Sequence, residues 1–418
     1  MKLSEIREVG VKQKVVLEAR DSGLERTCLA SLPDIQSHAL IVSGIRRCGK
    51  STLLHQFVKK LGRLFFYFNF DDLRLHDFSV ADFQLLDRII GESDTRLLFF
   101  DEVQSAEHWE LYVRQKLDEG FQVIITGSNA SLLSHELGTK LTGRHLSKEL
   151  FPFSYQEYCR FINQESPGGG VESLDRYLEQ GGFPEYLKTN NLEILTQLQS
   201  DILYRDIAIR YGIRDVSSLH RLFLYLLSNA AQLVSPSKLT QVAGVKSATT
   251  VLEYFSYFQS AYLIDLAPCF AWSAKAVSLA PKKLYIVDPG IIQTGSASFT
   301  DNHGALLENF VFNSLRLHTR DLYYFARENR ECDFIVDPHQ GKGSVRQPCC
   351  MQVCRELTTE NQDREIQGLI RALEFFGQDQ GVIITRDTED LILKAGKKIA
   401  VVPAWKYDFA GITALKQR

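Results

Sequence analysis

The length and composition of the chain indicate a globular protein of several domains. Its 418 residues predict two or three domains at about 150 residues each. Hydrophobic residues make up 44% and charged residues 24%, a balance that excludes wholesale disorder. The 48 Lys and Arg residues face 51 acidic residues, so the net charge of -3 does not indicate a nucleic-acid or membrane partner.

The apolar runs and the cysteines point to a cytoplasmic protein. The longest apolar runs, such as 63–68 and 97–100, are far shorter than the roughly 20 residues of a membrane helix. The amino terminus carries mixed charge and lacks the apolar segment of a secretory signal. The eight cysteines are scattered, and we expect free thiols rather than disulfides or zinc ligands.

The first part of the chain predicts an α/β domain. Residues 1–37 are polar and predict a helical extension. Strands are expected at four short apolar runs, 38–43, 64–70, 96–100 and 121–126, and helices at the amphipathic stretches 53–61 and 109–117. Alternating strands and helices predict a parallel sheet with helices on both faces. We assign 38–165 to this domain, which ends at a Pro- and Gly-rich stretch.

The second half predicts a helical domain over 166–295 and another α/β domain over 296–418. Ser235 and Pro236 predict a helix start, Gly244 its end, and 247–260 a second helix, which is the spacing of a helix–turn–helix. Beyond residue 284, short apolar runs alternate with helical patterns at 305–316 and 364–376.

A phosphate-binding motif follows the first predicted strand. Residues 44–51 match G-x-x-x-x-G-K-[ST] between a strand and a helix. Backbone N–H groups of such a loop surround phosphates, Lys50 neutralises their charge, and the Ser51 hydroxyl ligates Mg²⁺. The residues expected to bind the nucleotide are Gly44, Ile45, Arg46, Arg47, Cys48, Gly49, Lys50, Ser51 and Thr52.

Two carboxylates end the third predicted strand. Asp101 is expected to hold Mg²⁺ together with Ser51, and Glu102 to activate the attacking water as general base. A solvated acidic pair at a strand end is the alternative, which the phosphate loop about 50 residues upstream makes less attractive.

Other polar residues are weaker candidates. Asn129 or Ser128, after the fourth strand, is expected to orient the water or sense the γ-phosphate. Arg144 could stabilise transition-state charge, from its own or a neighbouring subunit, or be a plain surface arginine. Arg46 and Arg47 could touch phosphate or pair with an acidic group such as Asp71 or Asp72.

Together these residues resemble the prokaryotic AAA-like ATPases of the archaeal-type P-loop family, which carry a C-terminal domain of unknown function. The resemblance spans nearly the whole chain, and its segments are 44–51, 69–72, 101–102, 126–128, 143–144, 151–155, 181–185 and 281–288. It adds weight to Arg144 and implies ATP rather than GTP, since no guanine-reading N-K-x-D occurs.

In that family the middle region resembles a winged helix, which here corresponds to 235–265. The expected recognition helix, 247–260, contains no Lys or Arg and one acidic residue, Glu253. Contacts to DNA phosphates need cations. We therefore expect a packing or protein-contact role for this helix rather than DNA binding.

The C-terminal domain of the family resembles the restriction-endonuclease-like PD-(D/E)xK fold. The resemblance aligns Glu308 and Asp333 with its acidic positions, but Gln352 and Cys354 stand where Glu and Lys are needed. Metal affinity should therefore fall, and no ammonium remains to assist cleavage. We expect a degenerate nuclease-like module that binds or scaffolds.

The sequence thus predicts a Mg²⁺-dependent ATPase that uses Lys50, Ser51, Asp101 and Glu102. Three alternatives remain: an ATP-gated metal-dependent DNA nuclease with Glu356 replacing Gln352, a DNA-binding ATPase, and a nucleotide switch that does not hydrolyse. A protein partner or a homo-oligomer is expected beside ATP, and no membrane.

Overall fold

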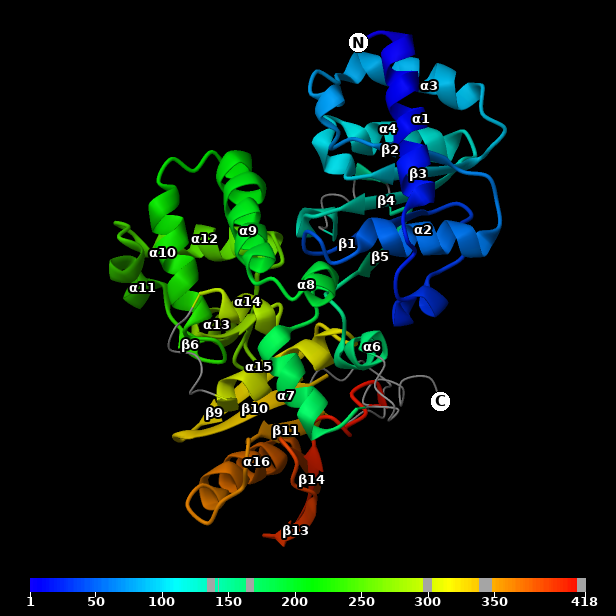
Figure 1. Cartoon of the computed structure of the whole chain (residues 1–418). Coiled ribbons are helices and arrows are strands. Elements are labelled where there is room, and N and C mark those ends of the chain that lie inside the picture. The colour runs from blue at the N-terminus through cyan, green and yellow to red at the C-terminus, as the bar shows by residue number, and fades with distance from the viewer. Residues whose placement is uncertain (134–139, 142, 163–168, 296–302, 338–347, 412–418) are drawn as a thin grey trace. The chain divides into compact units, whose positions relative to one another are not determined.

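The computed structural model describes residues 1–133, 140–141, 143–162, 169–295, 303–337 and 348–411 (Figure 1). The chain forms two compact units, Met1–Pro152 with Ser260–Tyr262, and Phe153–Gln259 with Leu263–Arg418. The domain boundaries expected near residues 165 and 296 fall on residues outside the described ranges, so the four-part division stays a prediction.

The first unit is built on a five-stranded parallel sheet with the strand order β2-β3-β4-β1-β5. Its strands are β1 (Ala39–Ser43), β2 (Phe66–Asn69), β3 (Leu97–Asp101), β4 (Gln122–Gly127) and β5 (His145–Glu149). The four strands expected from apolar runs and the parallel α/β class are confirmed. Strand β5 has no apolar run because it is an edge strand that is partly exposed.

Helices cover both faces of this sheet (Figure 1). They are α1 (Leu3–Ala19), α2 (Lys50–Leu61), α3 (Phe83–Gly91) and α4 (Trp109–Asp118), with short 3₁₀ turns η1 (Thr27–Ser31), η2 (Leu73–Leu75), η3 (Val80–Asp82), η4 (Val103–Ser105) and η5 (Ala130–Leu133). Apolar residues of α1, α3 and α4 share one core cluster with alternate strand residues such as Phe68 and Phe100. Leu53 and Leu54 of α2 are also buried, but they lie outside that cluster. Since the side chains of a strand alternate between the two faces of a sheet, we place α2 on the face opposite α1, α3 and α4.

The second unit begins with helices. They are α6 (Tyr155–Phe161), α7 (Val171–Gln180), α8 (Pro184–Thr189), α9 (Glu193–Asp201), the π-helix η6 (Ile202–Ile209), α10 (Val216–Leu227), α11 (Pro236–Ala243) and α12 (Ala248–Ser260). Pro236 is the first residue of α11, and Gly244 ends it in a left-handed conformation (φ 73°), so the two predicted helices and their turn are confirmed.

A small antiparallel sheet follows, with the order β6-β8-β7. Its strands are β6 (Leu233–Val234), β7 (Ile264–Ala267) and β8 (Lys282–Ile286), and α13 (Ala274–Leu279) and α14 (Pro289–Gln293) accompany them. The stretch 174–267, which the sequence predicts to be mostly helical, is helical with two short strands, β6 and β7.

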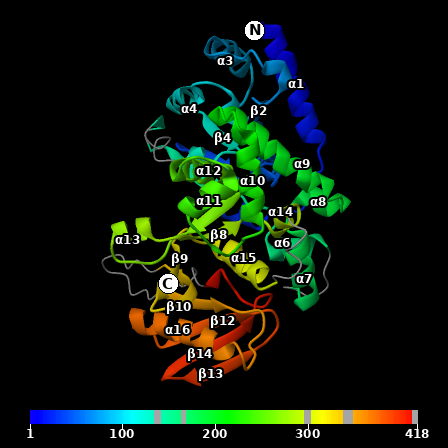
Figure 2. The ribbon, with the colours of Figure 1, turned by 90° about the vertical axis from the view of Figure 1, so that its left-hand side faces the viewer.

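The last part of the second unit is a six-stranded mixed sheet, ordered β13-β14-β12-β11-β10-β9 (Figure 2). Its elements are α15 (His303–Arg316), β9 (Leu322–Arg327), β10 (Arg330–Val336), β11 (Cys349–Val353), α16 (Gln362–Phe376), β12 (Gln380–Thr385), β13 (Asp390–Lys394) and β14 (Lys397–Pro403). Helix α16 packs with Ile335 and Cys350 on one face, and α15 packs with Phe334 and Met351 on the other. The α/β region expected in the last part of the chain is thus present.

No helix in the described part of the chain combines the length and the apolar character that crossing a membrane requires. All eight cysteines are free thiols.

Candidate functional site

The phosphate loop joins the end of β1 to the start of α2. Gly49 caps α2 with a φ of 99°, a conformation that residues with a Cβ rarely adopt. The first N–H groups of a helix have no partner within it and carry partial positive charge, so they favour an anion. Lys50 is 4% exposed, and its ammonium donates to the carbonyls of Gly44 (3.0 Å) and Ile45 (3.1 Å).

A buried arginine from the amino-terminal segment supports this loop. The Arg26 guanidinium donates to the carbonyls of Cys48 (2.9 Å) and Phe151 (2.8 Å). Cys48 is fully buried, and burial raises the pKa of its thiol, which therefore stays protonated and donates to the Leu150 carbonyl. Nothing in the sequence near Arg26 indicates this role, because its partners lie 22 and 125 positions away.

The two candidate metal ligands lie side by side. The Ser51 hydroxyl donates to Asp101 Oδ1 at 3.0 Å, the Thr126 hydroxyl donates to the same oxygen, and the Tyr67 hydroxyl donates to Oδ2 at 2.8 Å. Burial, followed by the charge of Glu102, raises the pKa of Asp101. A buried carboxylate and a hydroxyl are hard oxygen ligands, and a cation would stabilise the ionised carboxylate, so this pair fits Mg²⁺.

Glu102 is held beside the loop in a strained backbone conformation. Its φ of 47° lies in the left-handed region, and its N–H donates to the Thr126 hydroxyl at 2.9 Å. One carboxylate oxygen, Oε1, lies 3.8 Å from the Lys50 ammonium, and the other, Oε2, accepts from the Gln104 amide at 2.5 Å. Burial raises the pKa of Glu102, but Lys50, Gln104, Arg46 and Ser128 together more than offset this, so its pKa is lowered and the carboxylate is ionised at neutral pH.

The residues after β4 reach the same end of the sheet. Strand β4 lies between β3 and β1, so its carboxyl end adjoins both the acidic pair and the phosphate loop. Ser128 and Asn129 are both buried there, and the Ser128 hydroxyl lies 3.4 Å from the Gln104 amide nitrogen. Both sequence candidates are thus near the acidic pair.

Arg144 lies at the amino-terminal end of the strands, opposite the loop. Its carbonyl accepts from the N–H of Ala39, the first residue of β1, and its guanidinium pairs with Asp118 of α4 at 2.7 Å. The five residues of β1 separate this position from the loop by about 17 Å, at roughly 3.3 Å per residue. The structure therefore does not bring Arg144 to the phosphate loop of its own chain.

Asp72, one of the two acidic residues considered as a partner for Arg46 or Arg47, contacts residues outside the loop. Its carboxylate pairs with Arg74 at 2.6 Å and accepts from Gln13 of α1 at 3.0 Å. Those contacts join α1 to the segment that follows β2, at the end of the sheet that carries the loop.

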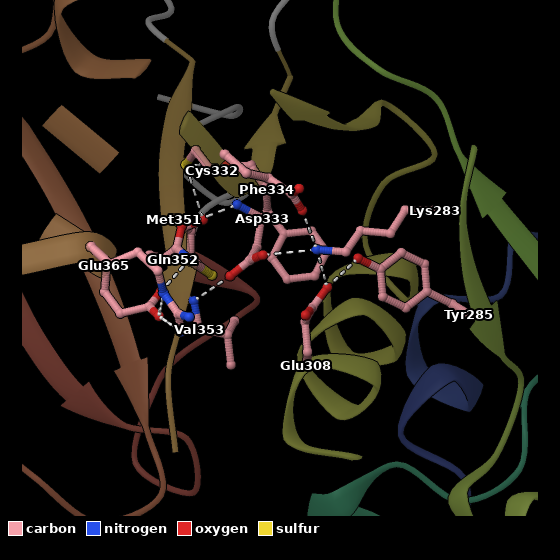
Figure 3. A network of polar contacts seen from close by, with 12 residues as sticks. Lys283, Tyr285, Glu308, Cys332, Asp333, Phe334, Met351, Gln352, Val353 and Glu365 are labelled. Carbon is pink, nitrogen blue, oxygen red and sulfur yellow. Dashed lines mark hydrogen bonds and ion pairs between the residues drawn. The ribbon is translucent and has the colours of Figure 1, made fainter. Parts of the chain in front are cut away.

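A second polar cluster lies in the other unit, around Lys283 of β8 (Figure 3). The Lys283 ammonium lies 2.7 Å from Glu308, 2.7 Å from Glu331 and 2.8 Å from Asp333. Burial lowers the pKa of Lys283, but Asp333 and Glu308 more than offset it, so the pKa is raised and the ammonium stays charged. The Tyr285 hydroxyl donates to Glu308 at 2.7 Å.

Gln352 completes this cluster. Its side-chain oxygen accepts from the backbone N–H of Asp333 at 3.2 Å, and its side-chain nitrogen donates to the Glu365 carboxylate at 2.7 Å. The Val353 N–H donates to the Asp333 carboxylate at 2.9 Å (Figure 3). Glu308, Asp333 and Gln352, which are far apart in the sequence, are thus brought together.

The expectation that this site lacks an ammonium needs correction. The lysine comes from β8, 50 positions before Asp333, rather than from the strand of Gln352, where Cys354 donates to the Glu356 carbonyl instead. No local sequence pattern indicates Lys283, because its role depends on the pairing of distant elements. Among the described residues, no group of three His, Cys, Asp or Glu side chains is arranged to hold a metal ion.

Two family models match the chain, and one of them falls mostly within the first unit. Residues 36–159 match the family model described as "AAA domain", and residues 171–300 match a domain of unknown function, DUF8612. Among solved structures, AMPPCP-bound DnaA of Aquifex aeolicus is 16% identical (TM-score 0.28; 60% of this chain, 88% of that one), and the Thermotoga maritima RuvB branch migration motor is 17% identical (TM-score 0.30; 62% and 89%).

Two curated relatives match much of the chain. A Haemophilus influenzae protein named "Uncharacterized protein" is 31% identical over 314 residues, which cover 71% of this chain and 78% of that protein. "Uncharacterized protein MJ1544" of Methanocaldococcus jannaschii is 33% identical over 395 residues, covering 88% and 87%. The chain therefore belongs to the same family as MJ1544, and its first unit is an AAA domain of the P-loop type.

Proposed function

We propose that the protein is a Mg²⁺-dependent ATPase whose first unit hydrolyses ATP at the loop 44–51. The observation that carries this proposal is one constellation: Ser51 is hydrogen-bonded to Asp101, and Lys50 lies beside an ionised Glu102. The four groups have the roles that phosphoryl transfer to water requires.

Each side chain has a defined task in the proposed reaction. Lys50 exchanges the carbonyls of Gly44 and Ile45 for phosphate oxygens, which offer its ammonium negative charge. Ser51 and Asp101 would hold Mg²⁺, which when bound neutralises charge on the β- and γ-phosphates. Glu102 Oε1 faces the ammonium, and hence the phosphate position, where it accepts the proton of the attacking water.

Two further residues complete the proposal. Asn129, or Ser128 beside it, would orient the water from the end of β4. Arg144 would act only on a neighbouring subunit, because it lies at the other end of the strands of its own sheet. We therefore propose that the active form is a homo-oligomer.

Glu102→Gln tests the assignment and separates hydrolysis from a switch that only binds ATP. The amide keeps the size of the side chain but removes the base. The rate of phosphate release should therefore fall at least about 100-fold while ATP binding persists. Glu107 is an exposed glutamate on the same segment of the chain, so Glu107→Gln is the matched control and should retain wild-type turnover. Equal single-turnover rates for Glu102→Gln and wild type would contradict the role of Glu102.

We further propose that the C-terminal part of the second unit is a nuclease-like module that does not cleave. Its order α15-β9-β10-β11-α16-β12 and its acidic cluster support the likeness. An ammonium already neutralises the carboxylates that a metal would need, which supports the loss of cleavage. Nucleotide state in the first unit would control what this module binds.

The alternative is an ATP-regulated DNA nuclease, favoured by one observation: two carboxylates and a lysine do gather in this module. Glu356, the acid considered as a substitute for Gln352, is exposed, whereas buried Glu365 is the one that contacts Gln352. DNA cleavage with Mg²⁺ or Mn²⁺ that Asp333→Ala abolishes would establish the nuclease and overturn the scaffold.

The element order in the middle of the second unit, α10-β6-α11-α12-β7-α13-β8, supports a likeness to a winged helix. We propose that this region contacts protein rather than DNA, because α12 has no Lys or Arg and exposes Leu252 and Glu253. Salt-dependent binding of fluorescent duplex DNA at micromolar protein would instead identify a DNA-binding ATPase.

A further inference from the structure

Gln104 lies near the acidic pair, and the proposed hydrolysis gives it no task. It belongs to η4, two residues after Glu102, and its amide nitrogen donates to Glu102 Oε2 at 2.5 Å. The same nitrogen lies 3.4 Å from the Ser128 hydroxyl. It therefore bridges the carboxyl ends of β3 and β4 at the site.

The orientation of the Gln104 amide is set by its surroundings. Its carbonyl oxygen is buried and has no hydrogen-bond partner among the described residues. Turning the amide over would place this oxygen against the Glu102 carboxylate, which is repulsive. An unpaired buried carbonyl is unfavourable, so the contact of the amide nitrogen with Glu102 is kept at the expense of a partner for the amide oxygen.

Gly127 at the end of β4 makes room for this pose. A Cβ at residue 127 would lie 2.3 Å from the Gln104 carbonyl oxygen and 2.1 Å from a methyl group of Leu132. Any larger residue at 127 would therefore displace the amide. The glycine and the glutamine act together, and their arrangement depends on the close approach of β4 to η4.

The two oxygens of Glu102 have different surroundings. Oε2 is bound by Gln104, whereas Oε1 lies 3.8 Å from the Lys50 ammonium, a separation too long for a hydrogen bond. Gln104, together with the Ser128 hydroxyl that also hydrogen-bonds to Glu102, restrains the carboxylate on one side and leaves Oε1 directed toward Lys50. The backbone of Glu102 is strained at φ 47°, which is the kind of outlier that persists where neighbours hold a functional side chain in place.

We propose that Gln104 is a positioning residue that holds Glu102 Oε2, so that Oε1 is aimed at the water attacking the γ-phosphate of ATP. The inference rests on the proposed ATP hydrolysis. In this proposal Gln104 acts through Glu102 and makes no contact of its own with ATP or the water.

Gln104→Met tests the assignment because it keeps the length and volume of the side chain and removes the donor. Turnover (kcat) should fall about 10- to 100-fold, the effect of a general base displaced by about 1 Å, while the dissociation constant for a fluorescent ATP analogue changes less than about twofold. Gln104→Asn keeps an amide that is too short to reach Glu102, and it should give the same split. The exposed Gln115→Ala on α4 is the matched control and should behave as wild type.

A double-mutant cycle separates positioning from general support of the fold. In the Glu102→Gln background, Gln104→Met should change kcat less than about twofold, because the side chain it orients no longer acts as a base. An unchanged or increased kcat in the single variants would overturn the inference, and so would an equal loss in both backgrounds. A wild-type protein without ATP turnover would instead defeat the proposed function, which makes the two failures distinguishable.

Discussion

Two buried lysines, one in each unit, show how a lysine near acidic residues can form two different kinds of site. Lys50 and Lys283 are both 4% exposed, and both lie near acidic residues from other elements of the fold. Lys50 contacts two backbone carbonyls and lies 3.8 Å from the nearest carboxylate, Glu102. Lys283 has three carboxylates within 2.8 Å.

These partners decide which lysine is available for a ligand. Neutral carbonyls are weaker partners for an ammonium than charged oxygens, so phosphate can displace the contacts of Lys50. The three carboxylates around Lys283 already satisfy its charge, so an added anion would gain nothing by displacing them. The first site is therefore poised for an exchange of partners, and the second is an internal salt bridge that joins β8 to α15 and β10.

The largest expected effect on stability comes from breaking the second site. Lys283→Met keeps an apolar chain of similar length but leaves the buried Glu308 and Asp333 without a cation, so the free energy of unfolding should fall by about 3–5 kcal/mol. The more exposed neighbour Lys282→Met is the control and should change it by less than about 1 kcal/mol. Denaturant titration measures both, and equal effects would contradict the role assigned to Lys283.

Arg144 is a third cation to compare with the two lysines, and its ion pair lies at the surface. It pairs with Asp118, whose side chain is 61% exposed, so Arg144→Ala should change the free energy of unfolding by less than about 1 kcal/mol. ATP turnover in the variant is the informative measurement. If Arg144 acts on a neighbouring subunit, adding an excess of the Lys50→Ala protein, which retains its arginine, should restore turnover to Arg144→Ala. No restoration would assign Arg144 to the surface only.

Local sequence patterns predicted the first site because its parts are contiguous. Lys50 and Ser51 belong to one loop, and Asp101 and Glu102 directly end an apolar strand, so spacing alone indicates their chemistry. The helix from Pro236 to Gly244 was equally readable from its cap residues. Short buried strands such as β1 and β3 were visible as uninterrupted apolar runs.

The remaining features depend on contacts between distant residues. Lys283 meets Glu308 and Asp333 only after β8 lies beside α15 and β10, and Arg26 meets Cys48 only after the amino-terminal segment has folded onto the loop. Strand β5 is a polar, partly exposed edge that no apolar run reveals, and β13 is an edge strand whose Leu391 and Leu393 are exposed. The position of Arg144 also follows from β5, and spacing along the chain could not place it.

Hydrolysis at the loop is tested by the release of phosphate from ATP by wild-type protein and by Lys50→Ala, with Mg²⁺ present. Lys60→Ala is the matched control, because Lys60 is an exposed lysine on the same helix. We expect turnover by wild type and by Lys60→Ala, and at least about a 100-fold loss in Lys50→Ala, on the order of other losses of charge stabilisation in phosphoryl transfer. Equal turnover in wild type and Lys50→Ala, or no turnover in any of the three, would contradict ATP hydrolysis at this loop.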